Sequence, residues 1–444
     1  MSYGEYMHSG MLVFADFIIE LSLKVSESCF GIPEVEFRRL HVISESIREI
    51  TSWEQRKVSD LFRVTRGYVL AATQTETTKT DEKSYPVYSS QTKDNGLMGY
   101  YKDYLYEDAI TWTTDGANAG TVNYRAGKFY CTNVCGVLLS NEVKANQMIA
   151  EALNNVAKGY VSYVGNPKLM NNVMADIVIQ IPTQAEEREQ LSTLFASLDH
   201  LITLHQKKVF SLTIVKKSML EKMFPKAGSK VPEIRFCGFT GDWEQRKLGD
   251  CFSPLQNNTL SRADLSDENG VVMNVHYGDV LIKFEECLDV SKERLPFVKK
   301  QSVADKFATS YLKNGDVIVA DTAEDETVGK CTEIIGLTDQ KVISGLHTIP
   351  LRPNEQFATG YLGFYLNSAA YHTQLKPLMQ GIKVTSISKS AMQDTVIKYP
   401  SDVKEQALIG QYFMNLDLLI TLHQKELDKL LALKKSMLSE MFPK

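Results

Sequence analysis

The sequence predicts an α+β protein with two pseudo-symmetric domains, separated by two long helices that form an antiparallel coiled coil. Three observations predict this fold class. Long segments of the 444-residue chain occur twice, and each copy includes a stretch with the apolar spacing of a long helix. The stretches between the copies carry short apolar runs punctuated by glycine turns, as short strands do.

The duplication has two parts with different offsets. Trp53–Lys57 recurs as Trp243–Lys247, 190 residues later (243 − 53 = 190). Leu198–Lys226 recurs as Leu416–Lys444, 218 residues later (416 − 198 = 218), and the run LITLHQK is identical in both copies. Each copy is therefore a variable block followed by a constant block. The variable blocks cover about 58–180 and 248–398, and they show no obvious similarity to each other.

These limits divide the chain into five segments, of which the first has no assigned role. They are an N-terminal segment 1–50, a first domain 51–182, a first helix 183–230, a second domain 231–399 and a second helix 400–444. Within the domains, the apolar runs 176–180 and 316–320 predict strands, and 148–156 and 361–366 predict short helices. The glycine-rich run 116–120 predicts a tight turn, with a phosphate-binding loop as the weaker alternative.

Each constant block predicts one long helix. Three apolar residues and one histidine alternate at three- and four-residue steps, which is the spacing of a coiled-coil seam: Phe195, Leu198, Ile202 and His205, then Phe413, Leu416, Ile420 and His423. Because a whole domain lies between the two helices in sequence, we expect them to pack antiparallel. The two histidines favour a polar position that fixes the register, with a metal or proton site as the alternative.

Composition and missing motifs exclude several classes of protein. The chain has ordinary globular composition, with 43% hydrophobic and 23% charged residues, and its longest apolar run, 11–19, is too short to cross a bilayer. We expect a cytoplasmic protein. Seven cysteines argue against a disulfide framework, and Cys131 and Cys135 are interpreted as structural thiols rather than a metal site. The net charge of −5 argues mildly against bulk electrostatic binding of DNA.

The sequence contains no recognisable catalytic set. It lacks the G-x-x-x-x-G-K-[ST] phosphate loop, the Asn/Asp-Pro-Pro-aromatic tetrapeptide of amino-methyltransferases, and the H-E-x-x-H and G-x-S-x-G motifs. We therefore expect no catalytic residues and no metal ligands in this chain.

Polar loops in both variable blocks carry chemical groups of the kinds that can read DNA. Asparagine and glutamine pair with adenine, lysine pairs with guanine, and hydroxyl groups bond to bases or phosphates. From composition alone, ordinary solvated loops are the favoured interpretation, and DNA reading is the alternative. The candidate DNA-binding residues are Gln91, Lys93, Asn118, Lys168, Gln380, Lys383, Thr385 and Ser386.

The layout of these segments resembles the specificity (S) subunits of type I restriction–modification systems. The resemblance rests on the two W-E-Q-R-K segments, the two L-D-x-x-I-T-L-H-Q-K helices and the two Met-Phe-Pro ends at Met223 and Met441. The runs Pro86–Gln91 and Thr113–Val122 also resemble target recognition domains of that family. The resemblance covers residues 51–444.

Membership of that family implies a recognition subunit without catalytic activity. Two target recognition domains each read one half of a split site in double-stranded DNA, and the helices space them. Two methyltransferase (M) subunits dock on the helices, bind S-adenosylmethionine and methylate adenine, and two restriction (R) subunits join them. The resemblance implies no cofactor in this chain and no membrane. The alternatives are a self-contained DNA methyltransferase or nuclease, and a coiled-coil scaffold without DNA specificity.

Overall fold

The computed structural model describes residues 52–90, 93–268, 270–381 and 383–442. The expected N-terminal segment 1–50 lies outside the described residues. The described chain forms two compact units: unit 1 holds the residues up to Gln206 and from Lys425 onward, and unit 2 holds Lys207–Gln424. Among the described residues, no helix is long and apolar enough to cross a membrane.

Unit 1 is built on a six-stranded sheet in the order β2-β7-β5-β6-β3-β4. Its strands are β2 (Phe62–Arg66), β3 (Tyr85–Tyr88), β4 (Leu97–Tyr101), β5 (Tyr106–Thr113), β6 (Val122–Cys131) and β7 (Cys135–Ser140). A separate antiparallel pair joins β1 (Trp53–Lys57) to β8 (Val178–Pro182). The short helices are α3 (Val58–Leu61), α4 (Gln147–Ala157) and α5 (Asn171–Asp176), with 3-10 turns at 72–74, 93–96 and 158–160.

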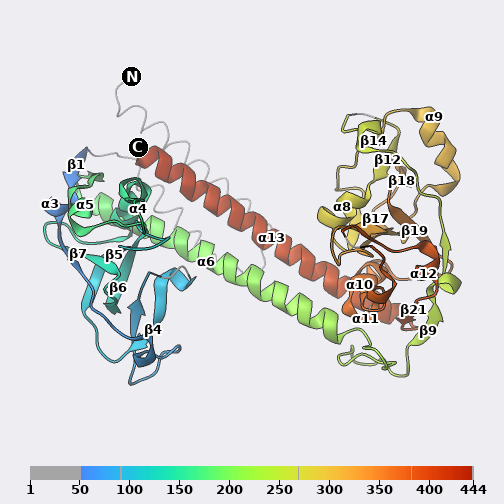
Figure 1. The fold of residues 1–444 in the computed structure, drawn as a ribbon, viewed down its shortest axis with the longest axis horizontal. Helices are drawn as coiled ribbons and strands as arrows, with labels where there is room; N and C mark the ends of the chain where they lie inside the picture. Colours follow the sequence, from blue (N-terminus) through green and yellow to red (C-terminus); the bar gives the residue numbers. More distant parts are fainter. Residues whose placement is uncertain (1–51, 91–92, 269, 382, 443–444) are drawn as a thin grey trace. The chain divides into compact units, whose positions relative to one another are not determined.

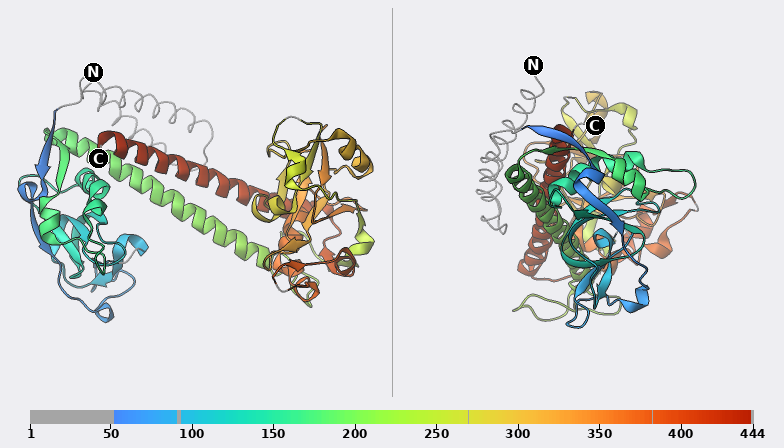
Figure 2. Two further views of the ribbon diagram at one scale, coloured as in Figure 1. Left: turned by 45° about the horizontal axis from the view of Figure 1, so that its top comes forward. Right: turned by 90° about the vertical axis from the view of Figure 1, so that its left-hand side faces the viewer.

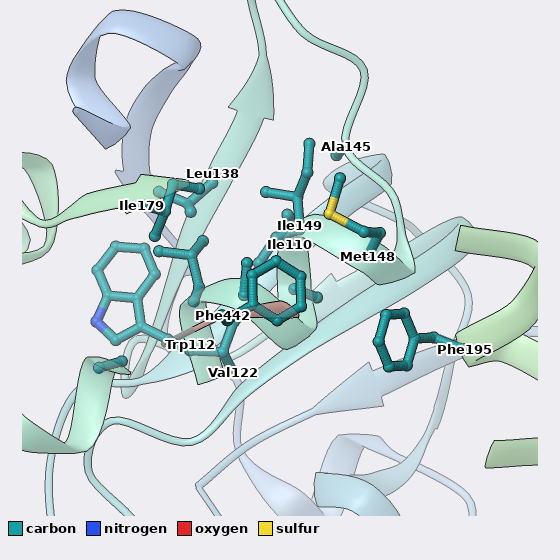
Figure 3. Close-up of a cluster of buried hydrophobic side chains, with 14 of the residues drawn as sticks. Ile110, Trp112, Val122, Leu138, Ala145, Met148, Ile149, Ile179, Phe195 and Phe442 are labelled. Atoms are coloured by element: carbon teal, nitrogen blue, oxygen red, sulfur yellow. The ribbon is translucent and has the colours of Figure 1, made fainter. Parts of the chain in front are cut away.

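The core of unit 1 lies between the sheet, α4 and the long helices. Trp112 and Ile110 of β5 pack with Met148 and Ile149 of α4, and all four side chains are buried. Figure 3 shows this cluster, which also includes Phe195 and Phe442. The ends of the constant blocks are therefore part of the same core as the variable block.

Unit 2 contains two larger sheets and two strand pairs. The sheet β10-β19-β15-β17-β13 is formed by Phe252–Pro254, Thr348–Pro353, Val317–Ala320, Cys331–Ile335 and Cys287–Asp289. The sheet β11-β14-β12-β18 is formed by Leu265–Ser266, Phe297–Val298, Val272–Val275 and Lys341–Ser344. The pairs are β16 (Thr322–Ala323) with β20 (Thr385–Ser386), and β9 (Glu244–Lys247) with β21 (Val396–Tyr399).

Short helices complete unit 2. They are α7 (Leu248–Cys251), α8 (Tyr277–Ile282), α9 (Gln301–Ala304), α10 (Tyr361–Asn367), α11 (Ala369–His372) and α12 (Lys389–Gln393), with 3-10 turns at 262–264, 305–310 and 376–378. The expected helices at 148–156 and 361–366 are confirmed as α4 and α10, and the expected strand at 316–320 is confirmed as β15. The strand expected at 176–180 begins two residues later, because Asp176 ends α5.

The two expected long helices are present as α6 (Ala185–Lys222) and α13 (Val403–Met441). In unit 1, Asp199 of α6 pairs with Lys434 of α13, whereas the earlier Phe195 packs against the later Phe442. The two helices therefore run antiparallel in unit 1, where they lie side by side (Figures 1 and 2). In unit 2, Lys216 pairs with Asp417, which is again a pairing between the two helices.

The predicted seam residues are mostly buried. In the first helix all four are nearly inaccessible to solvent, with exposed fractions of 0–8%: Phe195, Leu198, Ile202 and His205. In the second helix Phe413 and Leu416 are buried. Ile420 and His423 are only half-buried. The supercoiled geometry of a coiled coil stays a prediction. The part of the chain that the structure describes holds no cluster of three or more histidine, cysteine or acidic side chains suited to a metal ion.

The constant segments recur because they pack against one another in the same way in each unit. The phenylalanine of each Met-Phe-Pro end contacts the tryptophan of a W-E-Q-R-K segment: Phe442 lies 5.6 Å from Trp53, and Phe224 lies 6.4 Å from Trp243, between ring centroids. Each also contacts a phenylalanine of the opposite long helix, Phe195 or Phe413. Burial of these large rings stabilises the junction of helices and variable block.

Candidate nucleic-acid interface

A small hairpin in unit 1 carries one of the predicted DNA-binding residues, Lys168. The backbone N–H of Ser162 donates to the carbonyl of Lys168 at 2.8 Å, and the N–H of Lys168 donates back at 2.9 Å. Gly165 turns the chain with a φ of 78°, a conformation that favours glycine. Tyr163 and Val164 at the tip are 70% and 93% exposed. The hairpin therefore presents large side chains to the solvent.

Unit 2 contains a hairpin that is closed in the same way although its sequence is different. The N–H groups of Gln380 and Ser386 exchange hydrogen bonds with each other's carbonyls at 2.9 and 2.8 Å. These two residues lie 218 positions after Ser162 and Lys168 (386 − 168 = 218), which is the offset of the helix repeat. The structural repeat therefore extends into the variable blocks, where the sequences alone show no similarity.

The two hairpins are also joined to their sheets in the same way. In unit 1 the N–H of Leu169 donates to the carbonyl of Thr114, and in unit 2 the N–H of Ile387 donates to Asp321, both at 2.9 Å. The closing hydrogen bonds and the join to the sheet are thus the same in the two units, whereas the turns differ, because the glycine with positive φ is Gly165 in unit 1 and Gly381 in unit 2. Loops of different sequence on a common scaffold are the arrangement expected of a recognition surface.

Two further loops meet the hairpin in unit 1. The expected turn at 116–120 is present, and the N–H of Gly116 donates to the carbonyl of Pro167. The side-chain amide of Asn118 donates to the carbonyl of Ser90 at 3.0 Å. This amide therefore ties Ser90 to the turn 116–120, which itself contacts the hairpin. Of the predicted residues of that loop, Gln91 and the side chain of Lys93 lie outside what the structure describes.

In unit 2 the hairpin lies beside an aspartate–histidine pair that the sequence did not reveal. Thr385 and Ser386 pair with β16, whose Thr322 donates its hydroxyl to the Asp321 carboxylate at 2.7 Å. His347 Nδ1 lies 3.4 Å from the same carboxylate. His347 also has a φ of 56°, which is uncommon outside glycine and occurs at functional sites.

Aromatic groups extend this surface. The ring of Tyr277 lies 5.3 Å from that of His347 and 4.6 Å from that of His276, between centroids. Burial lowers the pKa of His276, and the charge of Arg262 lowers it further. His276 is therefore a neutral structural ring, whereas His347 is 47% exposed in its side chain and available to a ligand. Only the positive φ of His347 distinguishes it, and a sequence does not display φ.

The two predicted lysines differ in their surroundings. Lys168 lies 3.6 Å from the Asp115 carboxylate, so part of its charge is compensated. Lys383 is exposed and forms no ion pair among the described residues. Lys383 is therefore the more available cation for a phosphate or a guanine.

Cys131 and Cys135 are buried side chains of β6 and β7. Burial raises the pKa of Cys135 to about 11 and also raises that of Cys131. Both are therefore protonated, unreactive thiols at neutral pH in the metal-free chain. This agrees with their interpretation as structural residues.

Comparison with known proteins agrees with this architecture. The chain matches the family model described as "Type I restriction modification DNA specificity domain" over residues 51–212 and 240–432. A putative type I specificity subunit N-terminus from Mycoplasma pneumoniae is 38% identical over 31% of this chain and 73% of its own length. A further M. pneumoniae type I specificity subunit is matched over 39% of its own length, at 34% identity over 33% of this chain.

Two matches extend over most of the chain. The type I restriction enzyme MjaVIII specificity subunit of Methanocaldococcus jannaschii is 22% identical over 91% of this chain and 95% of its own length. The crystal structure of a type I restriction-modification S subunit from M. genitalium has the same fold, with a TM-score of 0.57, 13% identity and coverage of 89% of this chain and 97% of its own. The chain belongs to the family of type I restriction–modification DNA specificity subunits, with one specificity domain in each of its two matched regions.

Proposed function

We propose that this chain reads a split target in double-stranded DNA, with one half of the target read by each unit. The observation that carries the proposal is the pair of equivalent hairpins, 162–168 and 380–386. Both are closed and joined to their sheets by the same hydrogen bonds, and both present exposed polar side chains, which read DNA sequence at base edges. Different side chains at two equivalent places predict two different half-sites.

The chain acts in this proposal as a recognition subunit without catalysis. Adenine methylation belongs to the partner methyltransferase subunits, which bind S-adenosylmethionine, and cleavage belongs to the restriction subunits. The missing amino-methyltransferase tetrapeptide supports this division of labour. A self-contained methyltransferase or nuclease lacks support from any motif, and a scaffold without specificity does not account for the two displayed hairpins.

Exposed apolar side chains on the long helices support docking of the methyltransferases there. In unit 2, Phe210 and Ile214 of α6 are 68% and 51% exposed and lie one helical turn apart. Leu418 and Leu422 of α13 are 57% and 46% exposed with the same spacing. Apolar stripes of this kind mark protein interfaces. Phe210→Glu should abolish association with the methyltransferase, and Ser211→Glu, which adds the same charge at the next exposed position, should not.

The proposal is tested by sequencing modified adenines in cells that contain the methyltransferase partner, with and without this chain. We expect a two-part methylated motif that disappears when the chain is absent. Purified chain alone should neither bind labelled S-adenosylmethionine nor methylate DNA. Methyl transfer by the chain alone, or an unchanged set of modified adenines without it, would show that the proposed function is wrong.

A further inference from the structure

Arg125 of β6 is a buried cation to which the described residues supply no anion. The residue is 8% exposed. Among the described residues, no carboxylate oxygen lies within 4.0 Å of its guanidinium nitrogens. The buried or half-buried arginines of unit 2 are different. Arg352 and Arg235 each donate two hydrogen bonds to a carboxylate, that of Asp316 or Glu405.

The contacts of Arg125 are all with neutral groups. Its Nε donates to the Thr111 hydroxyl at 3.1 Å, and its Nη2 donates to the Asn95 carbonyl at 2.6 Å. The guanidinium carbon lies 3.7 Å from the centroid of the Tyr88 ring. Burial lowers the pKa of Arg125, yet a guanidinium stays charged at neutral pH. The chain therefore holds a positive charge in a poorly solvated place.

The guanidinium retains an open side. Its Nη1 forms no hydrogen bond with the described residues, whereas Nε and Nη2 each donate one. Tyr88 lies two residues before Ser90, whose carbonyl accepts from Asn118 of the turn 116–120, and Gly116 of that turn donates to Pro167 of the hairpin. The ring beneath Arg125 is therefore connected through this turn to the proposed DNA-reading hairpin.

A buried charge without a partner is costly, and it is retained where a ligand supplies the opposite charge. We infer that the counter-charge of Arg125 is a backbone phosphate of the DNA bound by unit 1. The inference rests on the proposed function and adds to it a phosphate-binding residue. A guanidinium pairs well with phosphate oxygens, and its fixed contacts with Tyr88 and Asn95 leave Nη1 preorganised for one.

The test uses the complex with the methyltransferase partner and a DNA duplex that carries the methylated motif found by sequencing. Affinity is measured over a series of salt concentrations for wild type, Arg125→Gln, Arg125→Lys and Lys128→Gln. Loss of one phosphate contact lowers the slope of log affinity against log salt by about 0.9. We expect that change for Arg125→Gln, with about tenfold weaker binding and an unchanged motif.

The other variants separate charge from structure. Arg125→Lys keeps the charge and should keep most of the slope. Lys128→Gln removes an exposed charge from the same strand, and the salt slope of this variant should equal that of wild type. Because Arg125 has no counter-charge in the free chain, Arg125→Gln should unfold at the wild-type temperature or above.

Several results would overturn the inference. An unchanged slope, an equal loss of slope in Arg125→Lys, or failure of Arg125→Gln to fold would show that Arg125 is a structural residue. A changed base at one position of the motif with a wild-type slope would assign Arg125 to a guanine instead. Failure of the wild-type complex to prefer the motif over a scrambled duplex would refute the proposed function itself, which is a different outcome.

Discussion

The two units anchor the long helices with the same lysine and aspartate but with different third partners. In unit 1, Lys434 pairs with Asp199 at 2.6 Å and with Glu151 of α4 at 2.8 Å. In unit 2, Lys216 pairs with Asp417 at 2.7 Å and with Glu286, which follows α8, at 2.9 Å. The lysines and the aspartates are each 218 residues apart, whereas the two glutamates come from unrelated elements. The helices thus supply a constant ion pair, and each variable block supplies its own acid.

Each lysine thus lies between two carboxylates, an aspartate of the opposite helix and a glutamate of the variable block, so the group of three has a net negative charge when both acids are ionised. Burial raises the pKa of Asp417 to about 6, although the neighbouring charge of Lys216 lowers it, and burial also raises the pKa of Glu151. Burial lowers the pKa of Lys434, but the charges of Glu151 and Asp199 raise it more strongly. Each lysine is therefore the cation that makes burial of two carboxylates tolerable.

The units also cap one helix in two different ways. In unit 1, the N-cap residue before α4 is Asn146, whose side chain accepts from the N–H of Ile149. In unit 2, the matching place before α10 is taken by Gly360, and the buried Glu333 of β17 accepts from the N–H groups of Gly360 and Gly363. Burial raises the pKa of Glu333 to about 7, although these hydrogen bonds lower it. A neutral local cap in unit 1 thus corresponds to an ionisable distant cap in unit 2.

The largest expected effect comes from removing either lysine. Lys434→Met should destabilise unit 1, and Lys216→Met unit 2, by about 3 kcal/mol, because each leaves two carboxylates without a cation. Hydrogen exchange measured by mass spectrometry distinguishes the units. Glu151→Gln should rescue part of the loss in Lys434→Met but none of that in Lys216→Met. Lys435→Met changes an exposed lysine and serves as the control. Equal effects of Lys434→Met and Lys435→Met would refute the comparison.

The different caps predict different responses to pH. The folded-state pKa of Glu333 lies above its ordinary value, so its contribution to stability is present below about pH 4.5 and is lost as pH rises through about 7. The loss is on the order of 3 kcal/mol. Glu333→Gln should flatten this part of the pH dependence in unit 2 and leave unit 1 unchanged, in hydrogen exchange corrected for intrinsic rates. A slope equal to that of wild type would assign the proton to another group.

The smallest expected effect sharpens the comparison of the hairpins. Lys383→Ala should weaken recognition of the half-site of unit 2, and so slow its methylation. If the lysine contacts a base, the loss of binding free energy should be roughly 1–3 kcal/mol. Lys168→Ala should cost less, because Asp115 already compensates part of that charge. Methylation rates on duplexes with either half-site altered distinguish the two. A larger effect of Lys168→Ala would mean that the ion pair in unit 1 breaks when DNA binds.

The sequence predicted the helices, whose buried side chains recur at a regular spacing. It did not predict the hairpins, which are defined by backbone hydrogen bonds. The seam spacing around Phe195 and Phe413 predicted two long helices, because buried apolar side chains must recur at helical steps. The equivalence of the hairpins was not predictable, since hydrogen bonds such as Ser162–Lys168 constrain backbone and not side-chain identity. Glu333 was missed because its hydrogen-bond partners are distant in sequence, and His347 because its backbone conformation is not visible in a sequence. The DNA-binding residues named from sequence stay predictions.

The most direct test of the two-reader account is exchange of one variable block. Residues 248–398 are replaced by the corresponding block of a related specificity subunit, and modified adenines are sequenced in cells that contain the methyltransferase partner. We expect one half of the methylated motif to change and the other half to stay the same. A change in both halves, or in neither, would contradict the claim that each unit reads its own half-site.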